Sequence, residues 1–337
     1  MKPARAAVLC LIAAACGGSG SKANPTAPDP SHVLSGQTVN VVDGTPLSDV
    51  DIQLGGGSAR ADANGNFQLP VSGDGPYAAA ITGAPVVQRR TTLTPQTNGP
   101  ARISLIPASF DLGAFDEMFR ATNHRLQRWA SQPSVVVVAS VMRYGSTATD
   151  RFTARSEQMT QAEIDTLISH LNEGLSLLTG GTYSSFASVE IERPQAGQQV
   201  IVQRTGKIVI GRYVGIGDDT GEPIIGYGNW AERTDGTVVG GTIWLDRDFD
   251  KNETARRLLR IHELGHALGY SHVARRRSVM NAALGPEPTD FDRAGAVIAF
   301  QRPIGNVAPD SDPSAGMAPA GTAQVSEGGT SWTKPIR

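Results

Sequence analysis

The residues best suited to chemistry lie in one stretch of the chain, ETARRLLRIHELGHALGYSH, which spans residues 253–272. The stretch predicts a helix over Thr254–Leu268, with Asn252 as its N-cap. Residues four apart on a helix lie one above the other, so His262 and His266 are expected to present their imidazoles on one face. Such a pair can place two nitrogen atoms on one metal ion at roughly 2.0–2.1 Å each.

Two further features extend this pattern toward a catalytic site. Gly269 follows His266 at a point where a helix can end in the left-handed conformation that glycine adopts readily, and His272 can then fold back as a third ligand. Three protein nitrogens leave a fourth position for water, as in catalytic zinc sites. Glu263 lies about 100° around the helix from His262, so its carboxylate is expected to act as the base toward that water without binding the metal.

The spacing of these residues is specific. In a chain with 6 histidines and 32 acidic residues, a chance match to His-Glu-x-x-His has a probability of order 1%. Requiring Gly269 and His272 as well multiplies that probability by roughly a thousandth. An ordinary helix that happens to carry two histidines is therefore the weaker interpretation.

The stretch resembles the metzincin zinc metallopeptidases, whose signature is H-E-x-x-H-x-x-G-x-x-H followed by a turn that contains methionine. Met280 follows His272 closely, and the resemblance implies that it forms an apolar floor beneath the metal without binding it. The resemblance also implies a mixed twisted sheet in which Gly240–Leu245 forms the edge that pairs with a peptide substrate. The implied activity is hydrolysis of peptide bonds with one catalytic Zn²⁺ ion.

Some positions differ from the pattern of this family. Val273 follows the third histidine, where the subfamilies usually carry Ser, Asp, Glu or Pro, and no tyrosine follows Met280. The short interval from His272 to Met280 is closest to matrixin-like members. A cysteine-switch propeptide is excluded because the two cysteines, Cys10 and Cys16, both lie in the first sixteen residues. The subfamily therefore stays open.

Acidic residues elsewhere offer weaker metal sites. Asp246–Asp250 alternates carboxylates, but Lys251 and Arg257 occupy positions at which an EF-hand needs glycine and glutamate. A looser Ca²⁺ site there stays open beside the alternative of a solvated loop that caps a helix. The same two interpretations apply to a second acidic group, Asp218, Asp219 and Glu222.

Other polar and aromatic residues give less specific signals. Arg275–Arg277, close to the third histidine, could favour acidic side chains on a substrate or form a solvated charge run. His124 and His170 are expected to be exposed or to have hydrogen-bond partners. Tyr227 and Trp230 are candidates for lining a cleft beside the metal.

The N-terminal residues have the pattern of a bacterial export signal. A basic start precedes the apolar stretch Ala6–Ala15, which is too short to span a bilayer comfortably. Residues 13–16 (AAAC), followed by a Gly/Ser run, resemble the lipobox of lipoproteins, although Ala13 stands where leucine is usual. The resemblance implies removal of residues 1–15, lipidation of Cys16 and anchoring in the cell envelope, at the outer membrane or the cell surface. Ordinary signal cleavage nearby is the alternative.

Two segments follow the signal. Residues 16–31 are Gly, Ser, Pro and polar residues, which predicts a flexible linker behind the lipidated cysteine. Residues 32–107 contain short alternating strands with turn signals and predict a small all-β sandwich. The turn at Asp62–Phe67 makes this segment resemble carboxypeptidase-regulatory-like domains, which are prealbumin-like sandwiches. That resemblance implies an accessory module without chemistry of its own.

Residues 108–302 predict an α/β (α+β) domain, because helical and strand patterns are intermixed. Thr160 and Glu163 have the spacing of a capping box at the start of a long helix, which Gly180-Gly181 ends. The other expected elements are a helix over Phe115–Trp129, strands at Val135–Val141, Val200–Gln203, Ile208–Ile210 and Thr242–Leu245, and a closing helix over Asp290–Phe300. Residues 303–337 are rich in Pro, Gly, Ala and Ser, which predicts a disordered tail.

Charge and motifs together leave two classes of function. A formal net charge of -2 gives no basic surplus, so nucleic acid is not expected as a partner. The first class is an anchored endopeptidase that cuts extracellular or periplasmic proteins. The second is a catalytically inert surface lipoprotein whose β-sandwich binds a protein or glycan partner. Glu263 favours the first class, because a binding protein has no need of a base beside its ligands. The substrate and the oligomeric state stay open.

Overall fold

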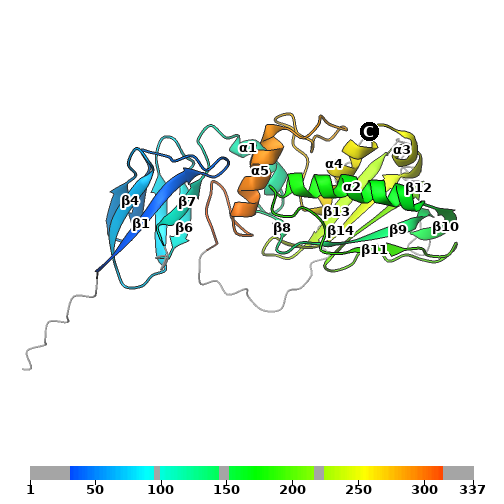
Figure 1. Ribbon diagram of the computed structural model, residues 1–337, viewed down its shortest axis with the longest axis horizontal. Helices are drawn as coiled ribbons and strands as arrows, with labels where there is room; N and C mark the ends of the chain where they lie inside the picture. Colours follow the sequence, from blue (N-terminus) through cyan, green and yellow to red (C-terminus); the bar gives the residue numbers. More distant parts are fainter. Residues whose placement is uncertain (1–30, 95–98, 144–151, 216–223, 314–337) are drawn as a thin grey trace, which may run out of the picture.

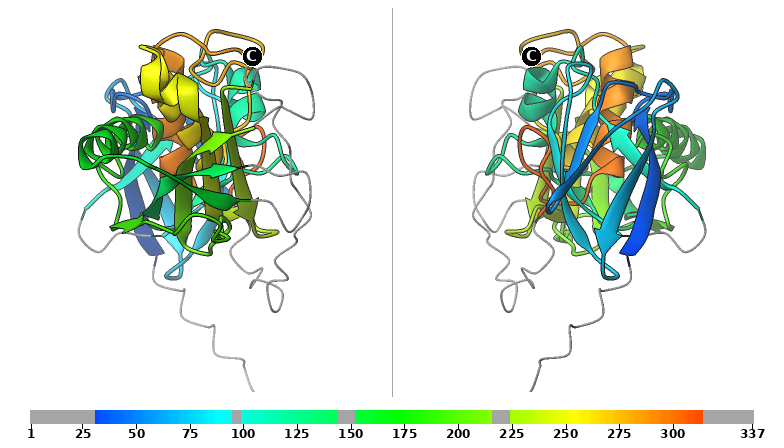
Figure 2. Two further views of the ribbon diagram at one scale, coloured as in Figure 1. Left: turned by 90° about the vertical axis from the view of Figure 1, so that its right-hand side faces the viewer. Right: turned by 90° about the vertical axis from the view of Figure 1, so that its left-hand side faces the viewer.

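The computed structural model describes residues 31–94, 99–143, 152–215 and 224–313. Within these ranges the fold is mixed α/β. Figure 1 shows a pair of β-sheets (blue to cyan) beside a larger sheet covered by helices (green to orange), and Figure 2 views the molecule from each of these two ends. None of the helices in these ranges combines the length and apolar character that crossing a bilayer requires. The predicted signal, Cys16 and the acidic group at 218–222 lie outside the described residues.

The N-terminal strands form two sheets that face each other. These strands are β1 (Ser31–Asn40), β2 (Asp51–Leu54), β3 (Gly57–Arg60), β4 (Asn66–Ser72), β5 (Tyr77–Thr82), β6 (Arg89–Leu93) and β7 (Ala101–Leu105). The strand orders are β4-β1-β7 in one sheet and β3-β2-β5-β6 in the other. Inward-facing apolar residues of both sheets, such as Phe67, Leu69 and Ile52, share one buried core. The paired sheets agree with the sandwich expected from the alternating pattern of residues 32–107.

The larger sheet carries the second half of the chain. Its strands are β8 (Arg128–Trp129), β9 (Ser134–Arg143), β10 (Thr153–Gln158), β11 (Val189–Glu192), β12 (Lys207–Val214), β13 (Gly226–Glu232) and β14 (Thr237–Asp246). The strand order is β10-β9-β12-β14-β13, with β11 beside β9 and β8 beside β14. β12 is parallel to β9 and β14, whereas β13 is antiparallel to β14. Val135 and Val136 of β9 enter cores on opposite faces of the sheet, so the apolar run of this strand is buried on both sides.

Helices cover one face of this sheet. They are α1 (Leu112–Phe119), α2 (Gln161–Leu178), α3 (Arg247–Asn252), α4 (Arg256–Ala267) and α5 (Asp290–Gln301). α2 begins with the predicted capping box, in which the Thr160 hydroxyl accepts a hydrogen bond from the Glu163 N–H and the Glu163 carboxylate accepts one from the Thr160 N–H. α4 packs against α2 on one side and against β13 and β14 on the other. The helix that carries the His-Glu-x-x-His pattern is therefore enclosed, and every residue from Leu259 to Ala267 is buried.

The helix predicted over Phe115–Trp129 is wrong in its second half. α1 ends at Phe119, and the chain then turns with Asn123 and His124 in the left-handed region, at φ values of 55° and 53°. Trp129 lies in the short strand β8. Trp129 is buried by core residues that are distant in the sequence, and not as part of an apolar face of a helix. The helical spacing of the apolar residues therefore predicted the wrong element here.

Two further boundaries differ from the prediction. The residues Val200–Gln203 form no strand, although Val200 and Val202 are buried against the face of the sheet opposite the helices. The helix predicted over Thr254–Leu268 begins later, at Arg256, and its N-cap residue is Ala255, which makes no side-chain hydrogen bond to the helix end. Asn252 instead ends α3, so the predicted N-cap is wrong.

The predicted edge strand is also wrong. β14 contains Gly240–Leu245 and is paired with β12 on one side and β13 on the other, so it lies inside the sheet. β13 is the last strand in this order and lies against α4. Gly228 permits this contact, because a Cβ atom there would lie 2.6 Å from the Cβ of His266. Strand pairing is a long-range property that the order of segments along the chain does not reveal.

Residues 303–313 are folded, so the prediction of a disordered tail is wrong for them. Asn306 and Asp310 are fully buried. The Asp310 carboxylate accepts hydrogen bonds from Arg89 on β6 and from Arg302 directly after α5. The segment also forms a parallel bridge with β6 through Ser311. Ion pairs with both halves of the described chain order a sequence whose composition alone indicates disorder.

The capping box of α2 gives a testable prediction. Partial burial raises the pKa of Glu163, but hydrogen bonds from Arg212 and Thr160 outweigh it and lower the pKa to about 2. We expect Glu163→Gln to lower the free energy of unfolding by about 1–2 kcal/mol at pH 7. Because the pKa is lowered in the folded state, this difference is present above about pH 4.5 and is lost as the pH falls toward 2.

Urea unfolding of both proteins between pH 7 and pH 2.5 measures this difference. Asp165→Asn removes a carboxylate from the same helix without touching the capping box and serves as the matched control. An equal difference between wild type and Glu163→Gln at both ends of the pH range would show that the ion pair with Arg212 contributes nothing.

Candidate metal centre

α4 presents two histidines on its buried face, and a third residue approaches from the segment that follows the helix. His262 and His266 are fully buried, whereas His272 is partly exposed. The Nε2 atoms lie 3.0 Å apart between His262 and His266, 3.1 Å apart between His266 and His272, and 3.3 Å apart between His272 and His262. Among the described residues these three form the group of side chains able to hold a metal ion. The sequence prediction of this group is thus supported by its geometry.

The other ring nitrogens of the two helical histidines fix their tautomers. His262 Nδ1 lies 2.7 Å from the carbonyl oxygen of Val279, and His266 Nδ1 lies 2.7 Å from that of Tyr270. A carbonyl only accepts hydrogen bonds, so each Nδ1 carries the proton and each Nε2 presents a lone pair to the centre. Lone pairs only 3.0 Å apart repel each other, and a cation between them would relieve this repulsion.

Burial keeps these rings neutral. Removal from water, together with His272, lowers the pKa of His262 to about 3, although the hydrogen bond to Val279 opposes this shift. Burial and the two neighbouring histidines lower the pKa of His266 well below its ordinary value. Burial also lowers the pKa of His272. Neutral imidazole is the form that binds metal ions, so the three rings are prepared for binding at neutral pH without losing a proton.

The end of α4 directs the third histidine. Gly269 has a φ of 102°, its N–H donates to the carbonyl of His266, and the N–H of Tyr270 donates to the carbonyl of Gly265. These two bonds form a Schellman motif, which ends the helix and turns the chain back. The Tyr270 hydroxyl then donates to the carbonyl of Leu178 at the end of α2. The side chain of Tyr270 thus anchors the chain two residues before His272.

Met280, which the resemblance to metzincins places beneath the metal, packs against α4. Gly265 faces it, and a Cβ atom at this position would collide with the Met280 sulfur. Met280 is fully buried, and its carbonyl accepts a hydrogen bond of 2.8 Å from the N–H of Val273. The methionine and the residue after the third histidine are therefore held together by the backbone.

A buried carboxylate holds the turn that carries Met280. Asp292, in the first turn of α5, accepts hydrogen bonds from the Ser278 hydroxyl and from the N–H of Val279. It also accepts a bond from the N–H of Thr289 within the capping box of α5. Since the carbonyl of Val279 accepts the proton of His262 Nδ1, Asp292 orients a candidate ligand through the backbone of one residue, Val279.

Glu263 is fully buried beside β13. Its carboxylate faces Gly226 and Gly228, where any larger side chain would collide with it. Burial raises the pKa of Glu263 well above its ordinary value, and Oε1 has no hydrogen-bond partner among the described residues. A buried carboxylate oxygen without a partner is costly unless a ligand or a cation compensates it. This oxygen is therefore a buried acceptor that the described part of the fold leaves without a partner.

The other candidates do not join this centre. Asp246 caps α3, and Asp250 is buried between arginines, so the carboxylates of the suggested calcium loop do not converge. Arg275–Arg277 are exposed, and Arg275 and Arg276 lie 4.0 and 3.7 Å from Glu117 and Asp111, which agrees with the alternative of a solvated charge run. Tyr227 stacks on Trp244 at the opposite face of the sheet, and Trp230 is buried in the main core. His170 has a partner, Arg260, as expected.

Several supporting residues escaped the sequence analysis. Asp292 could have been found from the spacing of Thr289 and Asp292, which is that of a capping box, but its bonds to the methionine turn have no local signal. Gly226 and Gly228 alternate as small residues on one face of β13, and this pattern indicates close approach of another element.

The chain matches no protein-family model and no curated protein.

The role of Asp292 leads to a prediction. Asp292→Asn replaces an acceptor by an amide that cannot accept all of the hydrogen bonds donated to Asp292, so the turn and His262 lose their orientation. We expect the affinity for Zn²⁺, measured by competition with a chelating dye, to fall by about 10- to 100-fold. Asp290→Asn removes an exposed carboxylate from the same helix turn and should leave the affinity unchanged. Unchanged binding by Asp292→Asn would contradict the positioning role.

Proposed function

We propose that the protein is a zinc-dependent endopeptidase of metzincin-like design. The observation that carries the proposal is the set of three imidazole Nε2 atoms, 3.0–3.3 Å apart. Glu263, which follows the first of these histidines on α4, adds a buried carboxylate with one oxygen that has no partner among the described residues. The methionine beneath α4 and the sequence signature over residues 262–280 support the same family. A mixed α/β sheet behind the helix is compatible with it.

The residues present fit a zinc ion. Nitrogen ligands placed tetrahedrally at 2.0–2.1 Å from zinc lie about 3.3 Å from one another, and the observed separations of 3.0–3.3 Å are close to that value. Imidazole nitrogens suit zinc, copper, iron and nickel, whereas calcium and magnesium prefer oxygen. Three protein ligands leave coordination open for water and substrate, which is the arrangement of a catalytic site.

The mechanism assigns a separate task to each group. The ion supplies Lewis-acid chemistry, because it polarises a carbonyl and makes a water molecule more acidic. The Glu263 carboxylate, whose ionised form the charge of a bound ion would favour, would accept a proton from the attacking water as the water oxygen forms a bond to the carbonyl carbon of the substrate. Glu263 then gives the proton to the amine nitrogen as the carbon–nitrogen bond breaks. The Val279 and Tyr270 carbonyls keep His262 and His266 oriented throughout.

Replacement of the base tests the proposal. We expect Glu263→Gln to keep about one zinc per chain while hydrolysis of a quenched peptide pool falls by about 10²- to 10⁴-fold, because proton transfer is lost and the ligands are not. Glu253→Gln removes an exposed carboxylate just before α4 and should keep full activity. Elemental analysis and initial rates, with and without a chelator, provide the two measurements.

Two outcomes would contradict the proposal. A wild-type protein that holds zinc and cleaves no member of a broad peptide library would favour the alternative, a surface lipoprotein whose β-sandwich binds a protein or glycan. A wild-type protein that binds no zinc would show that the three histidines do not form a metal centre.

The location of the protein is a second part of the proposal. The export signal and the AAAC sequence at residues 13–16 support a lipid anchor on Cys16 in the cell envelope. We expect the full-length protein to enter the detergent phase on Triton X-114 partitioning and Cys16→Ser to remain in the aqueous phase, since the acyl chains supply the membrane affinity. Cys10→Ser, in the same signal, should partition as the wild type does. Detergent partitioning of Cys16→Ser would contradict lipidation at this residue.

A further inference from the structure

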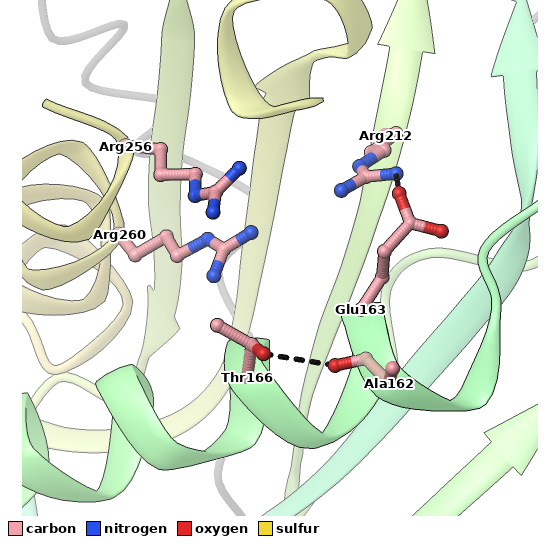
Figure 3. Close-up of a pocket in the computed structure, with 6 residues that line it drawn as sticks. All are labelled: Ala162, Glu163, Thr166, Arg212, Arg256 and Arg260. Carbon is pink, nitrogen blue, oxygen red and sulfur yellow. Dashed lines mark hydrogen bonds and ion pairs between the residues drawn. The ribbon is translucent and has the colours of Figure 1, made fainter. Parts of the chain in front are cut away.

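A pocket outside the histidine centre lies between α2, α4 and β12. Its walls are formed by Ala162, Glu163, Thr166, Arg212, Arg256 and Arg260, and its volume is about 190 Å³. Figure 3 shows Arg256 and Arg260 extending from α4 toward Arg212, which extends from β12, with Thr166 and Ala162 of α2 along one side. A water molecule occupies about 30 Å³ in the liquid. The pocket therefore has room for a small ion with some of its water.

Two of the three arginines are fixed by carboxylates. Arg212 donates from Nε to the buried Asp250 and from Nη1 to Glu163. Arg260 donates from Nε and Nη2 to the two oxygens of the same Asp250. Both arginine side chains are almost fully buried, with 3% and 1% of their surface exposed. Their guanidinium groups are thus held rigidly at the pocket before any ligand arrives.

The third arginine has no such partner. Arg256 donates from Nη1 to the backbone carbonyl of Lys251, and among the described residues no carboxylate forms an ion pair with it. Arg256 and Arg260 are four apart on α4, where like charges repel. Three guanidinium groups therefore meet two carboxylates, Asp250 and Glu163. The pocket keeps an uncompensated positive charge.

The neighbouring histidine does not change this balance. His170 Nδ1 lies 3.1 Å from Arg260 Nη1. Burial and then the charge of Arg260 lower the pKa of His170, so its ring is neutral and accepts the hydrogen bond. The excess charge of the pocket therefore comes from the arginines.

We propose that this pocket binds a small oxyanion, with inorganic phosphate and sulfate as its simplest representatives. Guanidinium groups form charge-assisted hydrogen bonds to such anions, and the planar fork of arginine suits two oxygens at once. An anion between Arg256 and Arg212 removes the repulsion within α4 and links that helix to β12. Because Arg260 lies two residues before His262, the anion stabilises the part of α4 that leads into the histidine centre.

Titration calorimetry with inorganic phosphate, and separately with sulfate, tests the proposal on the full mature chain at constant ionic strength. We expect saturable binding and a rise in the unfolding temperature with at least one of the two anions, relative to chloride. Arg256→Gln should weaken binding by about tenfold or more, because it removes the uncompensated charge. Arg155→Gln removes an exposed arginine of β10 and should bind as the wild type does.

The variant also separates this pocket from the histidine centre. Phosphate held by a metal at the three histidines would bind equally to wild type and to Arg256→Gln, and such a result would overturn the proposal. Absence of saturable binding of both anions to the wild type would overturn it as well. Neither readout depends on peptide hydrolysis, so the result stands whether or not the protein is a peptidase. Arg212 and Arg260 are unsuitable for the test because both hold the buried Asp250.

Discussion

The constraint on which the structure depends is the convergence of three imidazole Nε2 atoms on one point. Two of them belong to fully buried rings whose other nitrogens are committed to carbonyls, so the rings cannot turn away or share a proton. Without a cation, the fold holds the Nε2 lone pairs of His262 and His266 only 3.0 Å apart, where they repel each other. The surrounding contacts must therefore be rigid enough to resist that repulsion. This is the behaviour expected of a preorganised metal site, whose ligands are placed before the ion binds.

Rigidity comes from tertiary contacts at both ends of α4. The first turn lacks a side-chain cap, and the helix is held there by the buried pair of Arg260 with Asp250 on α3. The last turn ends in the Schellman motif at Gly269, and the indole of Trp129 donates to the carbonyl of Ala267. Asp292 then reaches from α5 to the methionine turn. The contacts of Arg260, Trp129 and Asp292 each join α4, or the segment after it, to a different element, so the geometry of the centre depends on tertiary structure.

The sequence predicted the histidine centre because its information is local. Two ligands four residues apart on a helix, followed by a glycine, can be recognised in the sequence without knowledge of the fold. The capping box of α2 is an equally local pattern. The features that the sequence did not predict depend on contacts between residues far apart in the chain. Trp129 resembled a residue of a helical stripe but is buried by distant contacts, and β13, not β14, is the last strand in the order of the sheet. The spacing of Thr289 and Asp292 predicts the capping box at the start of α5, but it does not predict the hydrogen bond from Asp292 to the turn that carries Met280.

The segment at residues 303–313 shows how the sandwich is joined to the rest of the fold. Its Asp310 is shared by Arg89 from the sandwich and Arg302 from the end of α5, and Asp312 forms a second pair with Arg89. Buried ion pairs add little net stability, but breaking one leaves an uncompensated charge, so they favour a single arrangement of the parts they join. Arg302 also donates to the carbonyl of Ser104 on β7. An alternative placement of the sandwich would leave these charges buried without partners. The ion pairs therefore hold the sandwich in one position relative to the rest of the fold.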